Sequence, residues 1–70
     1  MKKLKELRKA KKLTHQMMAN SLNISKPFYW QIENNKRRLS YDMAVKIADI
    51  LNTKPDEIFY QEFKNKSDIN

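Results

Sequence analysis

The sequence contains no cysteine and no glycine, and each absence narrows what the chain can be. Without cysteine there are no disulfide bonds and no cysteine-ligated zinc, so 70 residues depend on packing or oligomerisation for stability. Without glycine, helix ends that need a positive φ must use another residue, and asparagine is the usual substitute. The single histidine, His15, has no partners for a metal site, and no serine or threonine has a plausible base partner. The sequence therefore predicts no enzyme activity and no cofactor.

Long apolar runs are also absent. No run approaches the roughly 20 residues that a membrane-spanning helix needs, and no apolar segment typical of a secretion signal follows the basic start. We therefore expect a cytoplasmic protein without a membrane partner. Attachment of residues 2–12 to a membrane surface is an open alternative, although the apolar stripe of Leu4, Leu7 and Ala10 is narrow and lacks aromatic anchors.

Charge is abundant but unevenly distributed. The net charge is +7, and residues 1–12 carry seven basic side chains against one acidic side chain. The other residues carry eight basic and seven acidic side chains, which nearly balance. A basic end of this kind favours an anionic partner such as nucleic acid or an anionic membrane surface. A lysine-rich surface that only keeps the protein soluble is the alternative.

Apolar spacing and helix-end signals predict five helices, so the expected fold class is all-α. Thr14 and Ser40 are suitable N-caps, and Pro55 suits the first turn of a short last helix. Three helix ends carry a residue that tolerates a positive φ. These residues are Asn23, Asn35 and Asn52. We expect one compact domain over residues 1–63, followed by a frayed polar tail at 64–70.

Residues 14–34 are predicted to form two short helices joined by a tight turn. The start of the second of these helices is ambiguous. Ser25 is a good N-cap, but Pro27 disfavours the α conformation for the preceding residue and itself prefers the first helical position. The helix therefore begins either directly after Ser25 or one residue later, with Lys26 as the cap.

Three segments carry a family resemblance. They are LTHQMMANSLNIS at 13–25, IENNKRRLSYDMAVKIADIL at 32–51 and PDEIF at 55–59. In this order and spacing they resemble the Cro/repressor-type helix-turn-helix family, the xenobiotic-response-element group of bacterial and phage regulators, over roughly residues 2–60. The resemblance implies a compact, lambda-repressor-like DNA-binding domain of five helices, whose third helix enters the major groove. The implied function is that of a sequence-specific transcriptional regulator.

The resemblance also implies which residues contact DNA. Base reading falls to residues near the start of the third helix: Lys26, Pro27, Phe28 and Gln31. Gln31 suits a bidentate contact with adenine, Lys26 could reach guanine, and Phe28 could pack on a thymine methyl group. Contacts to the DNA backbone are expected from Thr14, His15, Ser25, Trp30, Asn34, Lys36 and Arg38. Ordinary exposed polarity is the alternative for Lys26 and Gln31, and partial burial is the alternative for Phe28 and Trp30.

The same resemblance makes predictions about the interior. Arg8 and Glu33 occupy positions at which the family pairs an arginine of the first helix with a glutamate of the third. We therefore expect a bidentate ion pair, with two independent solvated charges as the alternative. Tyr29 occupies a core position. His15 departs from the family pattern, because the family usually has there a glutamine that contacts phosphate and braces the recognition helix.

One recognition helix covers few base pairs, so proteins of this kind usually bind palindromic operators as two-fold dimers. We expect a homodimer interface at Ile58, Tyr60 and Phe63, with Phe59 inside the domain. A repressor is the expected role, because the sequence shows no separate activation or sensor domain. The alternative is an antitoxin-like or adaptor module that binds a protein through a Phe28/Trp30 surface, although the basic run at 36–38 favours double-stranded DNA.

Overall fold

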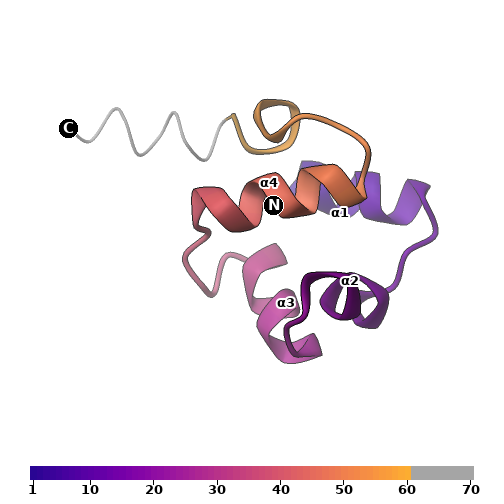
Figure 1. Ribbon diagram of the computed structural model, residues 1–70, viewed down its shortest axis with the longest axis vertical. Coiled ribbons are helices and arrows are strands. Elements are labelled where there is room, and N and C mark those ends of the chain that lie inside the picture. The colour runs from indigo at the N-terminus through magenta and orange to yellow at the C-terminus, as the bar shows by residue number, and fades with distance from the viewer. Residues whose placement is uncertain (61–70) are drawn as a thin grey trace.

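The computed structural model describes residues 1–60, in which the chain forms helices and no strand. The four labelled helices are α1 (Lys2–Ala10), α2 (His15–Leu22), α3 (Lys26–Glu33) and α4 (Tyr41–Ile50), and a fifth helical segment occupies 55–60 (Figure 1). The prediction of an all-α, five-helix fold is confirmed. The predicted polar tail at 64–70 and the predicted interface residue Phe63 lie outside the described residues.

Three of these helices begin with a hydroxyl cap. The side chains of Thr14, Ser25 and Ser40 each accept a hydrogen bond from the backbone N–H three residues later, at 3.1, 3.2 and 3.1 Å. Ser25 is therefore the cap of α3, which settles where that helix begins. Lys26 is its first residue and Pro27 its second. The missing N–H of Pro27 costs nothing there, because N–H groups in the first turn have no intrahelical partner.

All four labelled helices end in the same backbone turn. A residue with φ between 55° and 59° follows each one, and the two residues at the turn donate back to the helix. After α2, for example, Asn23 N–H donates to the Asn20 oxygen at 3.2 Å, and Ile24 N–H donates to the Ala19 oxygen at 3.0 Å. This is the Schellman arrangement, usually built with glycine. The residues at positive φ are Lys12, Asn23, Asn35 and Asn52.

The three asparagine turns confirm the predicted helix ends, whereas the turn at Lys12 was not predicted. Lysine gains no local side-chain hydrogen bond that would compensate for the left-handed backbone, so nothing in its chemistry signals such a turn. The conformation at Lys12 is imposed by the path of the chain from α1 into α2.

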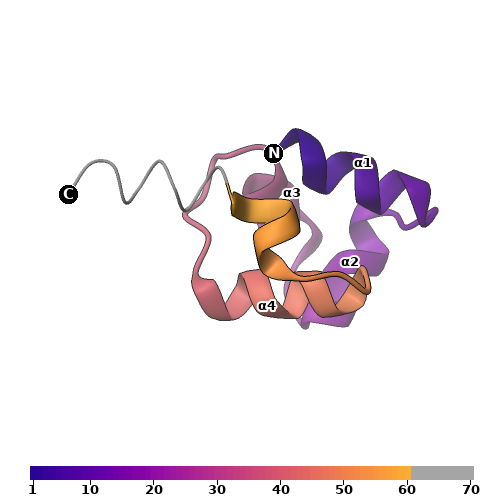
Figure 2. The ribbon, with the colours of Figure 1, turned by 90° about the horizontal axis from the view of Figure 1, so that it is seen from above.

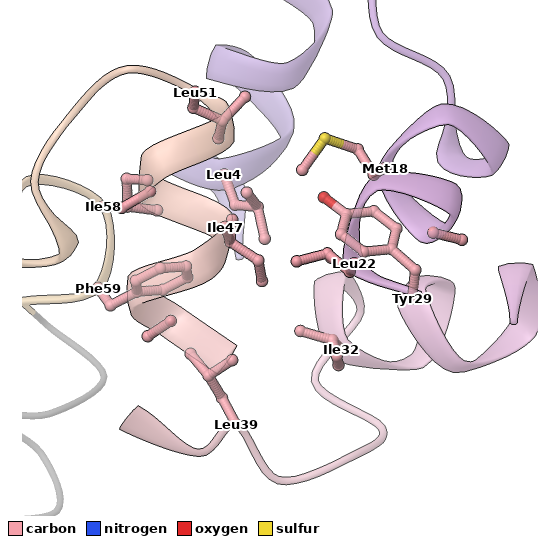
Figure 3. Packing of buried hydrophobic residues seen from close by; sticks show 13 residues of the cluster. Leu4, Met18, Leu22, Tyr29, Ile32, Leu39, Ile47, Leu51, Ile58 and Phe59 are labelled. Atoms are coloured by element: carbon pink, nitrogen blue, oxygen red, sulfur yellow. The ribbon is translucent and has the colours of Figure 1, made fainter. Parts of the chain in front are cut away.

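The hydrophobic core lies between two groups of helices. In Figure 1, α2 and α3 lie together below α1, α4 and the segment 55–60, and Figure 2 shows the same elements from above. Helix α2 packs against both α3 and α4. The side chains that meet between the groups include Leu4, Met18, Tyr29 and Ile47, and Phe59 lies beside α4; each of the five is 0% exposed (Figure 3). The predicted core positions of Tyr29 and Phe59 are confirmed.

Ile58 requires a correction. It was predicted to form part of a dimer interface, but its side chain is packed in the core and only 8% of the residue is exposed. Two successive side chains of this short helix, Ile58 and Phe59, are buried and hold it beside α4 (Figure 3). Tyr60, which follows them, is 54% exposed.

Candidate nucleic-acid interface

The outer side of α3 is formed by residues that the core does not use. Tyr29 and Ile32 point into the core, whereas Lys26 and Pro27 are exposed and Trp30 is 45% exposed. The helical period places these exposed residues on one side, with Gln31 half-buried at its border. The sequence had predicted this division of the helix for Tyr29 and Trp30.

Arg37 contacts both Phe28 and Gln31, and no sequence motif had pointed to it as a DNA-contacting residue. The guanidinium carbon of Arg37 lies 4.2 Å from the centre of the Phe28 ring, and Arg37 Nε donates to Gln31 Oε1 at 3.0 Å. Phe28 is half-buried and also packs against the core. Arg37 is nine residues after Phe28, across the end of a helix, so no local spacing rule predicted the contact.

The loop after α3 is basic and exposed. Lys36, Arg37 and Arg38 follow one another, and all three are exposed. Within residues 1–60, the side chains of Lys36 and Arg38 make no hydrogen bond or ion pair, in contrast to Arg37 between them. The side chain of Arg37 is therefore held by the protein, whereas those of Lys36 and Arg38 extend from the loop without a partner among residues 1–60.

Asn34 is held in place by contacts within the protein. Its Oδ1 accepts from Lys5 Nζ at 3.0 Å, and its Nδ2 donates to the Trp30 carbonyl at 2.9 Å. Lys5 thereby reaches the end of α3, so part of the charge of α1 lies next to the candidate DNA-contacting residues.

A buried ion pair joins α1 to α3. Arg8 Nε donates to Glu33 Oε2 at 2.9 Å, and Arg8 Nη2 donates to Glu33 Oε1 at 2.9 Å. Arg8 Nη1 also donates to the Leu13 carbonyl at 2.8 Å. The side chains are 8% and 0% exposed. The two charges are therefore bidentate partners inside the protein rather than independent solvated groups.

The surroundings of this pair shift the pKa values of its members. Burial is the largest influence on the Glu33 carboxyl and would raise its pKa, but Arg8, Tyr29 and His15 together outweigh burial and bring that pKa below its ordinary value. The hydrogen bonds between Arg8 and Glu33 raise the pKa of Arg8. Burial, followed by the adjacent Glu33 carboxylate, raises the pKa of the Tyr29 hydroxyl. At neutral pH the pair is therefore ionised and Tyr29 is neutral.

His15 faces the protein rather than solvent. Its Nε2 lies 3.5 Å from Glu33 Oε1, its ring centre lies 6.0 Å from that of Tyr29, and its side chain is 29% exposed. The ring therefore lies beside the buried carboxylate, and its contact with DNA phosphate stays a prediction. The replacement of glutamine by histidine at this position gave no indication of the direction in which the ring points.

An open depression of about 200 Å³ lies beside the ion pair. Its lining combines side chains of α1, the start of α2 and the end of α3. The lining residues are Lys5, Arg8, Lys9, His15, Trp30, Glu33 and Asn34. Because four of these are basic or imidazole groups and Glu33 is already bound to Arg8, the depression presents positive charge next to Trp30.

The start of α2 has an unusual cap. Thr14 Oγ1 accepts from Met17 N–H at 3.1 Å, while Thr14 N–H approaches Met17 Sδ at 3.4 Å. The reciprocal contact is usually made by glutamate or glutamine, so a neutral thioether here leaves the positive end of the helix without an acidic neighbour. This end remains suited to an anion.

Two kinds of site, a metal site and a membrane-spanning helix, are absent from the described part of the chain. Residues 1–60 contain no group of three or more His, Cys, Asp or Glu side chains that could hold a metal ion. Among the same residues, no helix has the length and apolar character required to span a bilayer. The arrangement is one of hydrogen-bond donors and positive charge around an exposed helix.

Comparison with known proteins agrees with this geometry. Residues 4–58 match the profile of the helix-turn-helix family. The HTH-type transcriptional regulator YqaE of Bacillus subtilis (strain 168), described as uncharacterized, is 38% identical over 63 residues. The alignment covers 90% of this chain and 54% of YqaE, so the chain spans about half the length of the curated relative that it matches.

Proposed function

Because the chain belongs to the Cro/C1-type helix-turn-helix family of transcriptional regulators, we propose that it binds specific sites in double-stranded DNA with α3 in the major groove. The family inferred from the sequence motifs is confirmed by the profile match. The observation that carries the proposal is the outer side of α3, where exposed Lys26 and Trp30 and half-buried Gln31 adjoin the basic loop at 36–38. A helix presented in this way fits the width of the major groove.

We assign the contacts in two groups. Base reading belongs to Lys26, Pro27, Phe28 and Gln31, with Phe28 acting through the side chains it supports because its ring is half-buried. Phosphate contacts belong to Lys36, Arg38 and Trp30, together with the capped starts of α2 and α3 at Thr14 and Ser25. Phosphate contacts supply affinity and salt dependence, whereas base contacts supply the sequence preference.

We further propose a homodimer on a palindromic operator, with half-sites about 34 Å apart. Ile58 is excluded from the interface by its burial, which leaves Tyr60 as the candidate within the described residues. A sedimentation experiment at high micromolar concentration checks this part separately. A monomer at that concentration would remove the dimer and leave the DNA-binding proposal standing.

Repression is the proposed direction of regulation, because occupancy of an operator is sufficient to block access to a promoter. The location that fits this role is the cytoplasm. An antitoxin-like or adaptor function is the second candidate, and the exposure of Trp30 is the observation in its favour. Phe28 weakens this candidate, since the ring is covered by Arg37 and packed on the core.

The test of the proposed function is selection of bound duplexes from a random pool, using the full chain. We expect enrichment of a two-fold symmetric motif, and weaker binding as salt rises. Recovery of unrelated sequences with equal affinity would contradict sequence-specific recognition. A motif without two-fold symmetry would contradict the dimer only.

A further inference from the structure

We propose that Arg37 and Gln31 act as one guanine-reading unit that Phe28 holds in position. This inference rests on the proposed function and goes further, because it names a base and adds a residue to the recognition surface. It also replaces the adenine contact that the sequence favoured for Gln31. The unit consists of the side chains joined by the Arg37–Gln31 hydrogen bond and the Arg37–Phe28 contact.

The end of α3 brings Arg37 back to the helix it has just left. At the turn, Asn35 has a φ of 58°, and its N–H donates to the Ile32 oxygen at 3.2 Å. Lys36 N–H then donates to the Gln31 carbonyl oxygen at 2.7 Å. The backbone at residue 36 is therefore tied to residue 31. The next side chain, that of Arg37, falls beside Gln31 rather than following the helix axis.

The hydrogen bond decides which groups of Gln31 remain for a ligand. A guanidinium has N–H donors and no acceptor, so the amide of Gln31 must turn its oxygen toward Arg37. Its NH₂ group then points to the other side. The groups left for DNA are then mostly donors: the amide NH₂ of Gln31 and the terminal N–H groups of Arg37, beside one remaining lone pair on the Gln31 oxygen.

A set of donors matches one base better than the others. In the major groove, guanine presents two acceptors, O6 and N7, whereas adenine presents one acceptor and one donor. A bidentate contact of glutamine with adenine needs the amide oxygen, and Arg37 already takes one of its two lone pairs and fixes its direction. The pair is therefore complementary to guanine, and arginine is the side chain most suited to its two acceptors.

Phe28 makes the arrangement rigid before DNA arrives. The cation lies 4.2 Å above the ring centre, within the range of a cation–π interaction, and the ring is itself anchored on the core. A side chain already held in its binding geometry loses less conformational freedom on association. Arg38, next in the chain, has the same side chain without this support, so it provides a matched control.

The test compares Arg37→Lys with Arg38→Lys, since both substitutions keep the charge and remove the planar fork. Duplex selection with the full chain is followed by affinity measurements on the selected site and on versions with each guanine replaced by adenine. We expect Arg37→Lys to lose preference for guanine at one position of each half-site by roughly 5- to 150-fold, the value of one good base contact. Arg38→Lys should keep the preference of the wild type.

Two further variants test the unit rather than the single residue. Gln31→Ala should weaken the same guanine preference as Arg37→Lys. Phe28→Leu, which keeps an apolar contact with the core, should reduce that preference in the same direction. Thermal unfolding of each variant establishes that it is folded before binding is compared.

The outcomes separate this inference from the proposed function. If the wild type selects a motif but Arg37→Lys selects the same motif with the same preference, the guanine-reading unit is wrong and DNA recognition stands. Selection of adenine opposite Gln31, lost in Gln31→Ala and unaffected in Arg37→Lys, would likewise overturn it. If the wild type selects no motif, the proposed function itself fails.

Discussion

Helix α3 carries two arginine contacts, one inside the protein and one on its surface. Arg8 binds Glu33 with side chains 8% and 0% exposed, while Arg37 binds Gln31 among exposed and half-buried residues. The inner contact joins two charges from different helices, and the outer contact joins a charge to a neutral amide. The first determines where α3 lies, and the second determines what its outer side offers. An arginine thus holds α3 in place in one case and orients the groups on its outer side in the other.

The two arginine contacts differ in what their loss costs, because one is buried and the other is exposed to water. A charge removed from water depends on its partner, because the loss of that partner leaves an uncompensated ion in the interior. A guanidinium at the surface can exchange its protein contact for water at little net cost. Four predictions test this contrast, beginning with the largest effect.

Removing the inner arginine should destabilise the domain strongly. Arg8→Met keeps the aliphatic stem but strands the Glu33 carboxylate, which should cost about 3–5 kcal/mol. A domain of 70 residues has a total stability of about 4–10 kcal/mol, so about a third of it or more would be lost. Urea unfolding followed by circular dichroism measures the change. The matched substitution Arg37→Met should cost less than about 1 kcal/mol, and equal losses in the two variants would refute the contrast.

Acid should weaken the inner contact and not the outer one. The pKa of Glu33 is lower in the folded protein than in the unfolded chain, where a glutamate has a pKa of about 4.3. The stabilisation is therefore fully present above that pH and is lost as pH falls through the lower pKa of the folded state. Gln31 has no acid group to titrate.

The measurement compares urea unfolding of the wild type and Glu33→Gln at pH 7 and at about pH 3. The other carboxylates titrate in both proteins, so the difference between the two isolates Glu33. We expect this difference to shrink in acid. A difference that stays constant over the range would show that the Glu33 carboxylate is not the titrating group.

Replacing Lys12, in the turn next to Arg8, with a residue that tolerates a positive φ should stabilise the protein. Lys12 has a φ of 58°, and the following Leu13 both donates to the Arg8 carbonyl at 3.1 Å and accepts from Arg8 Nη1. Lys12→Asn places here the residue that the other three turns use, and should stabilise the protein by about 1 kcal/mol. The midpoint of thermal unfolding reports the gain. Lys11→Asn, at a φ of −90°, is the control and should give no gain.

The smallest expected effect concerns Arg38, whose side chain makes no hydrogen bond or ion pair among residues 1–60. Arg38→Ala should weaken binding to every duplex alike and lower the slope of log affinity against log salt by about one. Over a fourfold change in salt this amounts to roughly a 3.5-fold difference in affinity. Titrations at several salt concentrations, on the selected site and on an unrelated duplex, provide the slopes. A loss confined to the selected site would place Arg38 among the base-reading residues instead.

Much of the fold was predictable because its signals are local. Thr14 and Ser40 cap helices through bonds to residues three positions away, and Asn23, Asn35 and Asn52 end them because asparagine tolerates a positive φ. Apolar spacing identified the core sides of the helices, including Tyr29. The motif spacing also identified the family, and it suggested the Arg8–Glu33 pair only through the resemblance.

The rest depended on the tertiary structure. The start of α3 was ambiguous because Ser25 and Pro27 give opposing local signals, and the structure shows the Ser25 cap with its hydrogen bond from Phe28 N–H. Ile58 was assigned to an interface because composition alone does not distinguish a surplus apolar residue from one that α4 covers. The direction of the His15 ring depended on a carboxylate 18 residues away, which no local rule could supply.

The sequence by itself therefore determined the helices, their ends and the family, because hydrogen bonds between near neighbours govern them. Only the tertiary structure decided which long side chains meet: Arg8 with Glu33 across two helices, and Arg37 with Gln31 across a helix end. Such contacts depend on distances in space that the chain closes by folding. The proposed base preference belongs to this second class, since it follows from one hydrogen bond that turns the amide of Gln31.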